Sequence, residues 1–379
     1  MPLRWNENRL TAKLRIDYPV IQGPLGGLSS QKLTAAVSNF GGLGSFGSHG
    51  LTPEAIKEAI AEIRSLTSKP FAMNLWVSME DEGARTSDEV AFNRALDTLA
   101  AHLDALGAPR PKYKPYSPLR FEDQARALLD AKVPVFSFIV GIPPREILDE
   151  CRTKGIVTIG GATTPDEAAA LNDAGVDAIV ASGFEAGGHR GSFLRAAEDS
   201  LTGTFSLVPQ ITDMVNVPVI AAGGIADARG VIAALALGAE AVQMGTAFLA
   251  CEESGASPLH RETLRRRNAG HTALTKGFTG RLARAIRNRV MEDLNRSGTA
   301  VLPYPLQREL VRNLSIAAEA AGRADLVPMW AGQSANLSTC TDVSAFLTSL
   351  VEEVSEIAGP IIQWSAARRE DQILRKANS

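Results

Sequence analysis

One histidine in this sequence stands in a setting that suits proton chemistry. The stretch ASGFEAGGHRGSF follows a short apolar run, and within it His189 lies among Gly187, Gly188 and Gly191. Imidazole changes its protonation state near neutral pH, and glycine neighbours leave room for another molecule beside the ring. We therefore select His189 as the candidate acid, base or hydrogen-bond donor. The remaining histidines lack this setting, and we interpret them as structural or exposed: His49, His102, His260 and His271.

Two glycine turns further along the chain could hold an anion. AAGGIAD places Gly223 and Gly224 after one apolar run, with Asp227 able to cap the helix that follows, and QMGTAF places Gly245 and Thr246 after the next run. Backbone N–H groups bared by glycine, a helix N-terminus and a threonine hydroxyl are donors suited to a phosphate. Either turn alone would be an ordinary connection, but the pair favours a phosphate group.

Polar side chains that could meet a flat ring follow two earlier apolar runs. QGPLGG contains Gln22 and Gly23, and FAMNLWV contains Asn74. The Asn74 amide can both donate and accept, and its neighbours are apolar, so we expect it to contact a cofactor. The alternative stays open that Gln22 and Asn74 bond strand ends or neighbouring loops. Near the end of the chain, Trp330 could line a pocket or fill a junction, and the junction is favoured.

The elements that would position these residues follow a repeating pattern. From Tyr18 onward, short apolar runs alternate with alanine-rich segments of helical period, which is typical of βα units around a parallel sheet. Eight units predict a TIM-type (β/α)₈ barrel, with the active site at the carboxyl ends of the strands and a phosphate site after strands 7 and 8. We expect strands near residues 20–25, 43–46, 71–77, 133–140, 156–159, 178–181, 217–222 and 241–248.

Two stretches break this rhythm and predict a smaller, inserted, mainly helical lobe at residues 79–118 and 251–328. The first is polar, with one helix expected at 88–106, and the second is charged and helical in period. The barrel would then comprise residues 1–78, 119–250 and 329–379, with a final amphipathic helix at about 342–357. The arginine run from Arg261 to Arg289 has acidic neighbours and no interleaved aromatics, so a salt-bridged or solvated face is favoured over a nucleic-acid surface.

Composition points to a small-molecule partner. The chain has 379 residues, 45% hydrophobic content and a formal net charge of −3, so no overall field attracts nucleic acid or an anionic membrane. Cys151, Cys251 and Cys340 lack the spacing of a metal site or a disulfide framework. No apolar run has the length of a signal peptide or membrane span. We expect a cytoplasmic protein without a metal.

Taken together, these motifs resemble the larger class of the nitronate monooxygenase (2-nitropropane dioxygenase) family. The similar segments are QGPLGG, FAMNLWV, FEAGGHRGSF, AAGGIADARGVIAALALGAEAVQMGTAF, FTGRLARAIRNRV and WAGQ, whereas residues 79–119 carry no family signature. The resemblance implies noncovalent FMN on a TIM-type barrel. It also implies oxidation of alkyl nitronates, or of nitroalkanes, by O₂ to a carbonyl compound and nitrite.

The resemblance also assigns residues. His189 matches the catalytic histidine of the family, and Ser182 stands where many members carry a glutamine, which shortens a flavin contact. With the turns described above, the expected cofactor-binding residues are Gln22, Gly23, Asn74, Ser182, Gly187, Gly188, Gly223, Gly224, Gln243, Gly245 and Thr246.

Two other functions fit the same barrel. No G-x-G-x-x-G fingerprint opens a βαβ unit, which favours electrons that come from the organic substrate. The alternatives are an NAD(P)H-dependent FMN reductase acting on a quinone or an enoyl thioester, and a flavin-binding barrel without turnover. The sequence leaves the oligomeric state open, a homo-oligomer included.

Overall fold

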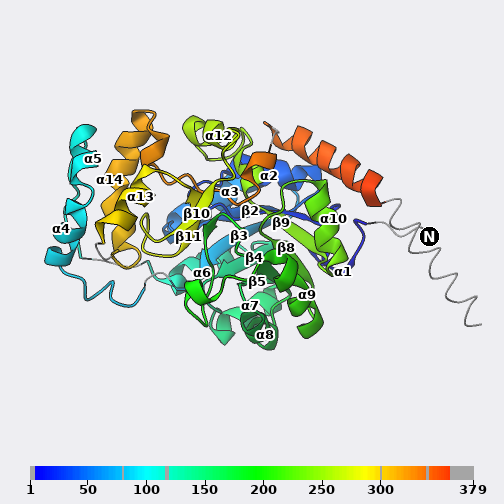
Figure 1. Ribbon diagram of the computed structural model, residues 1–379. Helices are drawn as coiled ribbons and strands as arrows, with labels where there is room; N and C mark the ends of the chain where they lie inside the picture. Colours follow the sequence, from blue (N-terminus) through cyan, green and yellow to red (C-terminus); the bar gives the residue numbers. More distant parts are fainter. Residues whose placement is uncertain (1–4, 79–80, 116–118, 299–300, 339–340, 359–379) are drawn as a thin grey trace, which may run out of the picture.

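Eight parallel strands form a barrel at the centre of the protein (Figure 1). The computed structural model describes residues 5–78, 81–115, 119–298, 301–338 and 341–358. Strands pair in the order β1-β9-β8-β6-β5-β4-β3-β2, and a parallel bridge between Ile21 and Leu43 joins the two ends of the sheet. This confirms the TIM-type barrel. The strands are β1 (Val20–Gln22), β2 (Gly44–Gly47), β3 (Phe71–Trp76), β4 (Val135–Ile139), β5 (Val157–Ala162), β6 (Ala178–Ser182), β8 (Val219–Ala222) and β9 (Ala241–Met244).

Alternating side chains of these strands face two separate apolar layers. Val219 and Ala221 pack outward against the helices, whereas Ile220 and Ala222 point into the barrel. The short helix α1 (Arg9–Leu14) contributes Leu10 to the inner layer, so the barrel interior is filled by side chains at this end. Alternation of this kind is what a closed, two-faced sheet requires.

Most of the described helices lie around the outside of the barrel, and several begin at a recognisable cap. Pro53 starts α3 with a cap from Thr52, and Asp227 caps α10 by accepting from the N–H groups of Arg229 and Gly230. The expected strand at 241–248 ends at Met244, because Gly245 begins a short helix there. The helices are α2 (Gln31–Phe40), α3 (Pro53–Leu66), α6 (Phe121–Asp130), α7 (Arg145–Lys154), α8 (Pro165–Asp173), α9 (Thr204–Met214), α10 (Ala228–Ala236), α11 (Thr246–Leu249) and a helix over residues 343–358.

A second group of elements has an apolar core of its own, which includes Phe92, Leu264, Val290 and Leu310. Its helices are α4 (Glu89–Asp97), α5 (Ala100–Ala105), α12 (Pro258–Leu264), α13 (Arg289–Ser297) and α14 (Leu306–Ala320). We propose the barrel and lobe boundaries given above on the basis of this separate core. The core also takes in residues from the neighbouring barrel segments: Leu249, Ala250, Met329, Ala331 and Ala335.

Two details of this lobe differ from the prediction. The single helix expected at 88–106 is divided into α4, which ends at Asp97, and α5, which begins at Ala100. At the break, the hydroxyl of Thr98 donates to the carbonyl of Ala95 at 2.7 Å. The segment 251–328, expected to be helical, contains the strands β10 (Thr272–Thr275) and β11 (Ala283–Ile286). They form an antiparallel hairpin, and the two-residue strand β7 (Gly188–His189) pairs with β11 as a third strand.

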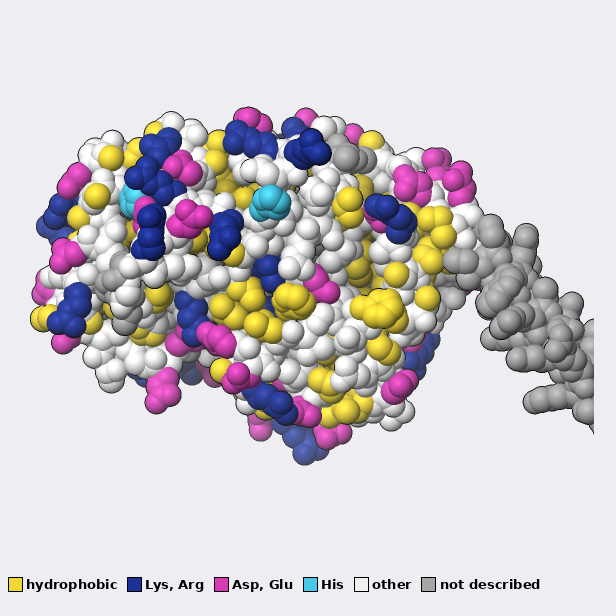
Figure 2. All heavy atoms as spheres, in the orientation of Figure 1, with side chains coloured by type: hydrophobic (Ala, Val, Ile, Leu, Met, Phe, Trp, Pro, Cys, Tyr) yellow, Lys and Arg dark blue, Asp and Glu magenta, His cyan; other side chains and the backbone are white. Residues whose placement is uncertain are grey.

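The basic residues of this lobe are accompanied by acidic ones (Figure 2). Arg266 bonds Glu262 at 3.0 Å, and Arg289 lies 3.5 Å from Asp293. Both contacts match the salt-bridged face predicted for the arginine run. Within the described residues, no helix combines the length and the apolar composition needed to cross a bilayer.

Candidate active site

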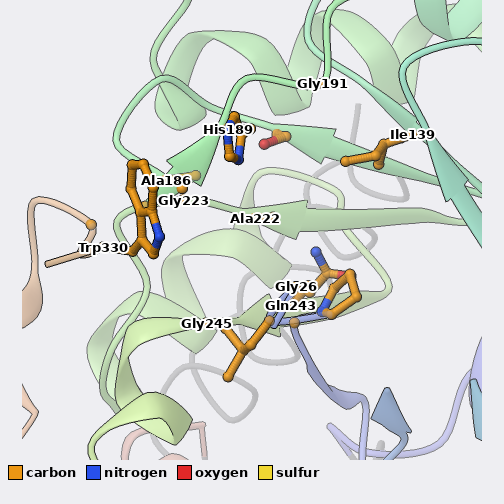
Figure 3. Close-up of a pocket in the computed structure, with 18 of the residues that line it drawn as sticks. Gly26, Ile139, Ala186, His189, Gly191, Ala222, Gly223, Gln243, Gly245 and Trp330 are labelled. Atoms are coloured by element: carbon orange, nitrogen blue, oxygen red, sulfur yellow. The ribbon is translucent and has the colours of Figure 1, made fainter. Parts of the chain in front are cut away.

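A cavity of about 280 Å³ lies at the carboxyl ends of the barrel strands and beneath the second lobe. Figure 3 shows His189 and Trp330 on one side of it, with Gln243 and Gly245 across from them. All but one of the residues predicted from the sequence line this cavity: Gly23, Asn74, Ser182, Gly187, Gly188, His189, Gly223, Gly224, Gln243, Gly245 and Thr246.

The exception is Gln22, which is fully buried at the junction of β1 and β2. Its Nε2 donates to the carbonyl of Ser45 at 2.7 Å and to that of Gly23 at 2.5 Å, while its Oε1 accepts from the Ser45 N–H at 3.0 Å. Protein groups thus occupy both ends of the amide. Gln22 thus bonds two strand ends together, which is the alternative that the sequence left open, and it is not among the residues that line the cavity.

The turns after β8 and β9, the last two barrel strands, form a cradle of exposed backbone. Gly223 and Gly224 have φ values of +104° and +73°, which other residues rarely adopt. The N–H of Gly224 has no acceptor among the described residues. The hydroxyl of Thr246 accepts from the Gly332 N–H at 2.9 Å, which leaves the hydroxyl proton available to a ligand. The cradle therefore has two donors that are free to bond a ligand.

Three of the polar side chains predicted to bind the cofactor lie elsewhere on the cavity wall. Asn74 is buried and donates from Nδ2 to the Ser137 hydroxyl at 3.0 Å, so part of its amide is used within the protein. The side chains of Gln243 and Ser182 make no hydrogen bond with the described part of the chain. These two groups are consequently free to bond a ligand.

Glu185 and Arg190 hold the glycine loop rather than line the cavity. Both carboxylate oxygens of Glu185 accept from the Thr204 N–H, at 2.9 and 3.0 Å. The buried guanidinium of Arg190 donates to the carbonyls of Ser182, Gly183 and Ser200, at 3.0, 2.8 and 2.9 Å. This network fixes the loop that carries His189.

His189 itself lies in a largely aromatic setting. Its ring centroid is 4.9 Å from that of Trp76, edge-on, and 5.3 Å from that of Trp330. Its Nε2 is 2.9 Å from the hydroxyl of Thr279. Burial, together with the nearby His49, Arg281 and Arg308, lowers the pKa of His189 to about 3. The imidazole is therefore neutral at pH 7 and has a lone pair for an incoming proton.

Several cavity residues were missed in the sequence. His49 stacks on Trp76 with ring centroids 4.1 Å apart and planes 7° apart, and its buried Nδ1 has no hydrogen-bond partner among the described residues. Its place directly after β2, at the carboxyl end of a strand, was the signal that could have identified it. Tyr304 and Arg308 reach the cavity from the second lobe, where no local motif marks them. Trp330 also lines the cavity. The role favoured from the sequence, filling the junction between the lobes, is therefore incomplete.

Fold and site together define an enzyme of the TIM-barrel class, with an anion cradle after the last two barrel strands and a histidine across the cavity. The sequence profile described as nitronate monooxygenase matches residues 7–353, and the chain belongs to the nitronate monooxygenase family. It is accordingly an oxidoreductase of a flavin-dependent family.

Individual relatives agree with this assignment. A Staphylococcus aureus (strain Newman) protein named "Probable nitronate monooxygenase" is 41% identical over 354 residues, which is 93% of this chain and 99% of that protein. The structure of nitroalkane oxidase from Streptomyces ansochromogenes superposes with a TM-score of 0.84 at 34% identity, covering 93% of this chain and all of that one. FabK from Thermotoga maritima gives a TM-score of 0.73 at 29% identity, covering 94% and 99%.

The buried histidines predict a pH dependence of stability. Burial lowers the pKa of His49 from 6.5 to about 3. Between these values the unfolded chain binds a proton that the folded protein does not, so stability is lost as pH falls from 7 to 5. Replacement of His49 by Gln removes this contribution. The decrease in the free energy of unfolding over this interval should be smaller by about 2 kcal/mol in the variant.

Denaturant unfolding at both pH values, at equal cofactor content, measures this difference. His271→Gln serves as the control, because His271 is exposed. Equal pH dependence in wild type and His49→Gln would show that His49 does not stay neutral in the folded protein.

Proposed function

We propose that this protein is an FMN-dependent enzyme that oxidises alkyl nitronates, and neutral nitroalkanes, with O₂ to a carbonyl compound and nitrite. The observation that carries the proposal is the cavity in which the anion cradle, the free Gln243 amide and the neutral His189 lie together. Family membership and the likeness to a nitroalkane oxidase support a nitro compound as substrate.

The residues present fit FMN. The bared N–H of Gly224, the Thr246 hydroxyl and the turn at Gly245 would hold the phosphate, as the free donors of the cradle suggest. Gln243 and the remaining hydrogen-bonding capacity of Asn74 would meet the polar edge of the ring, with Ser182 nearby. When bound, the flavin supplies the transfer of electrons from substrate to O₂.

The charges around the cavity favour an anionic substrate. Arg281 and Arg308 both contribute to the low pKa of His49 and His189, which means that the potential in this region is positive. The same field stabilises a nitronate, or the negative charge that forms when a nitroalkane loses its α proton. Neutral His189 would accept that proton, and the resulting imidazolium would pair with the nitronate beside it.

The cofactor assignment predicts that Gly224→Val yields folded protein with little flavin. A valine at φ +73° distorts the cradle and covers its N–H groups. Gly27→Val is a matched control, because Gly27 has the same φ of +73° but does not line the cavity. The measurement is flavin absorbance per folded protein. Full occupancy in Gly224→Val with a normal circular dichroism spectrum would refute the assignment.

The source of electrons separates this proposal from the reductase alternative. Anaerobic stopped-flow mixing with a preformed alkyl nitronate should bleach the flavin absorbance, because the substrate is the reductant. NADH and NADPH should not bleach it on the same time scale. Rapid bleaching by a nicotinamide and none by the nitronate would instead establish a reductase.

The role of His189 is tested by its replacement with Asn. If His189 is the base, turnover of a neutral nitroalkane should fall by roughly 10²–10⁴-fold, the usual effect of removing a general base. Turnover of the preformed nitronate should fall much less, since that substrate has already lost its proton. His271→Asn, at an exposed position, should leave both activities unchanged.

The two substrates also distinguish the other outcomes. Equal losses on both, with flavin still bound, would make His189 an electrostatic group rather than a base. No loss on either would show that the glycine loop is structural and that the active site lies elsewhere.

A further inference from the structure

Thr279 occupies a fixed position between the second lobe and His189. It lies in the turn between β10 and β11, is 5% exposed and lines the cavity. Its N–H donates to the carbonyl of Lys276 at 3.2 Å, as does that of Gly280 at 2.8 Å. A Cβ on Gly280 would lie 2.5 Å from the backbone nitrogen of Tyr304, so the turn packs directly against the neighbouring chain. The Thr279 hydroxyl is therefore held in place by the backbone around it.

This hydroxyl has two partners and only one proton. Its Oγ1 lies 2.9 Å from Nε2 of His189 and 3.3 Å from the carbonyl oxygen of Arg281. A carbonyl oxygen can only accept, and no other donor among the described residues bonds the Arg281 carbonyl. If the hydroxyl donated to the histidine instead, this carbonyl would lose its partner, which buried backbone groups rarely tolerate. The hydroxyl therefore donates its proton to the carbonyl oxygen of Arg281, and a lone pair of the hydroxyl oxygen faces His189.

The hydrogen bond then determines which ring nitrogen of His189 is protonated. An oxygen that has given its proton to Arg281 can only accept from Nε2, so Nε2 must carry a hydrogen. In a neutral imidazole this leaves the lone pair on Nδ1. No hydrogen bond occupies that nitrogen within the part of the chain that the structure describes.

We propose that Thr279 is a positioning residue that holds His189 in its Nε2–H tautomer and thereby makes Nδ1 the proton acceptor. The inference rests on the proposed function, in which His189 takes the α proton of a nitroalkane. The proton passes from the substrate carbon to Nδ1, the C–H bonding pair stays on the substrate as the nitronate, and Nε2–H remains bonded to Thr279. In the opposite tautomer Nδ1 would carry a hydrogen and could not accept the proton.

Other contacts restrict the ring but do not select a tautomer. The antiparallel pairing of His189 with Ala283 fixes its backbone, and the edge-on contact with Trp76 fixes the plane of the ring. Neither partner offers a hydrogen-bonding atom to the ring nitrogens in these contacts. The Thr279 hydroxyl is thus the group that determines which ring nitrogen of His189 carries the hydrogen.

A pair of substitutions separates this role from packing. Thr279→Val keeps the shape of the side chain and removes the hydroxyl, whereas Thr279→Ser keeps the hydroxyl. With neutral nitroalkane, kcat of Thr279→Val should fall about five- to tenfold, the factor that corresponds to one lost hydrogen bond, while KM stays close to wild type. Turnover of the preformed nitronate should change by less than about twofold, since it needs no base. Thr279→Ser should restore nitroalkane turnover to near the wild-type value.

The tautomer can be observed directly in the FMN-loaded enzyme. Long-range ¹H–¹⁵N correlation spectra of histidine-labelled protein, with the His189 signals assigned through His189→Asn, report which nitrogen carries hydrogen. We expect Nε2–H alone in wild type and in Thr279→Ser, and a second population with Nδ1–H in Thr279→Val. This measurement does not depend on any activity, and the wild-type spectrum is decisive even if Thr279→Val fails to fold.

Each outcome supports or overturns the proposal. Nδ1–H in wild type would overturn it, as would unchanged tautomer and unchanged nitroalkane turnover in folded Thr279→Val. Equal losses on nitroalkane and nitronate would also overturn it, because a packing defect affects both. A failure of the proposed function looks different: His189→Asn would keep full nitroalkane turnover while the spectra still showed Nε2–H.

Discussion

The candidate active site depends on a two-residue ladder between the barrel and the second lobe. Gly188 and His189 pair with Arg284 and Ala283 of β11, and the next N–H, that of Arg190, donates to Leu282 at 2.9 Å. Without this ladder the loop would keep the bonds of Glu185 and Arg190 to the barrel, but backbone donors such as the N–H of Arg190 would lose their partners. Barrel and lobe therefore place His189 together. The lobe supplies the strand on which the histidine is aligned, the threonine that bonds its ring and part of the aromatic wall around it.

The local chemistry of the site could be predicted from the sequence, whereas its assembly could not. A few residues of sequence are enough to recognise the glycine turn at Gly223–Gly224 and the glycine-flanked His189, because backbone freedom and imidazole chemistry are local properties. Arg281 bonds Asp81 across 200 residues of sequence, and no local pattern connects them. Gln22 was assigned to the cofactor because an amide at a strand end suits either role, and only the neighbouring strand shows that Ser45 uses it. The hairpin β10–β11 was missed because the segment 251–328 around it is charged and has a helical period, so the whole segment was interpreted as helical.

The cavity places neutral imidazoles and cationic guanidiniums close together, which is unfavourable for folding but suited to an anion. Arg281 is buried and lies beside the rings of Trp76 and Tyr304, 5.3 and 4.7 Å from their centroids, with Asp81 at 2.6 Å. This arrangement keeps one positive charge partly compensated within the protein. Arg308, in contrast, is exposed and has no described ion pair, so its charge is available to the cavity. Ionisable side chains that lie among aromatic and apolar ones are a common sign that a region is organised for binding rather than for stability.

The inner apolar layer of the barrel has a consequence for molecular traffic. Side chains such as Ile220, together with Leu10 of α1, fill the interior below the cavity, so the described residues close the barrel toward its amino end. A molecule bound beside His189 is therefore expected to enter and leave at the carboxyl ends of the strands. If it does, one occupant has to leave before the next can take its place.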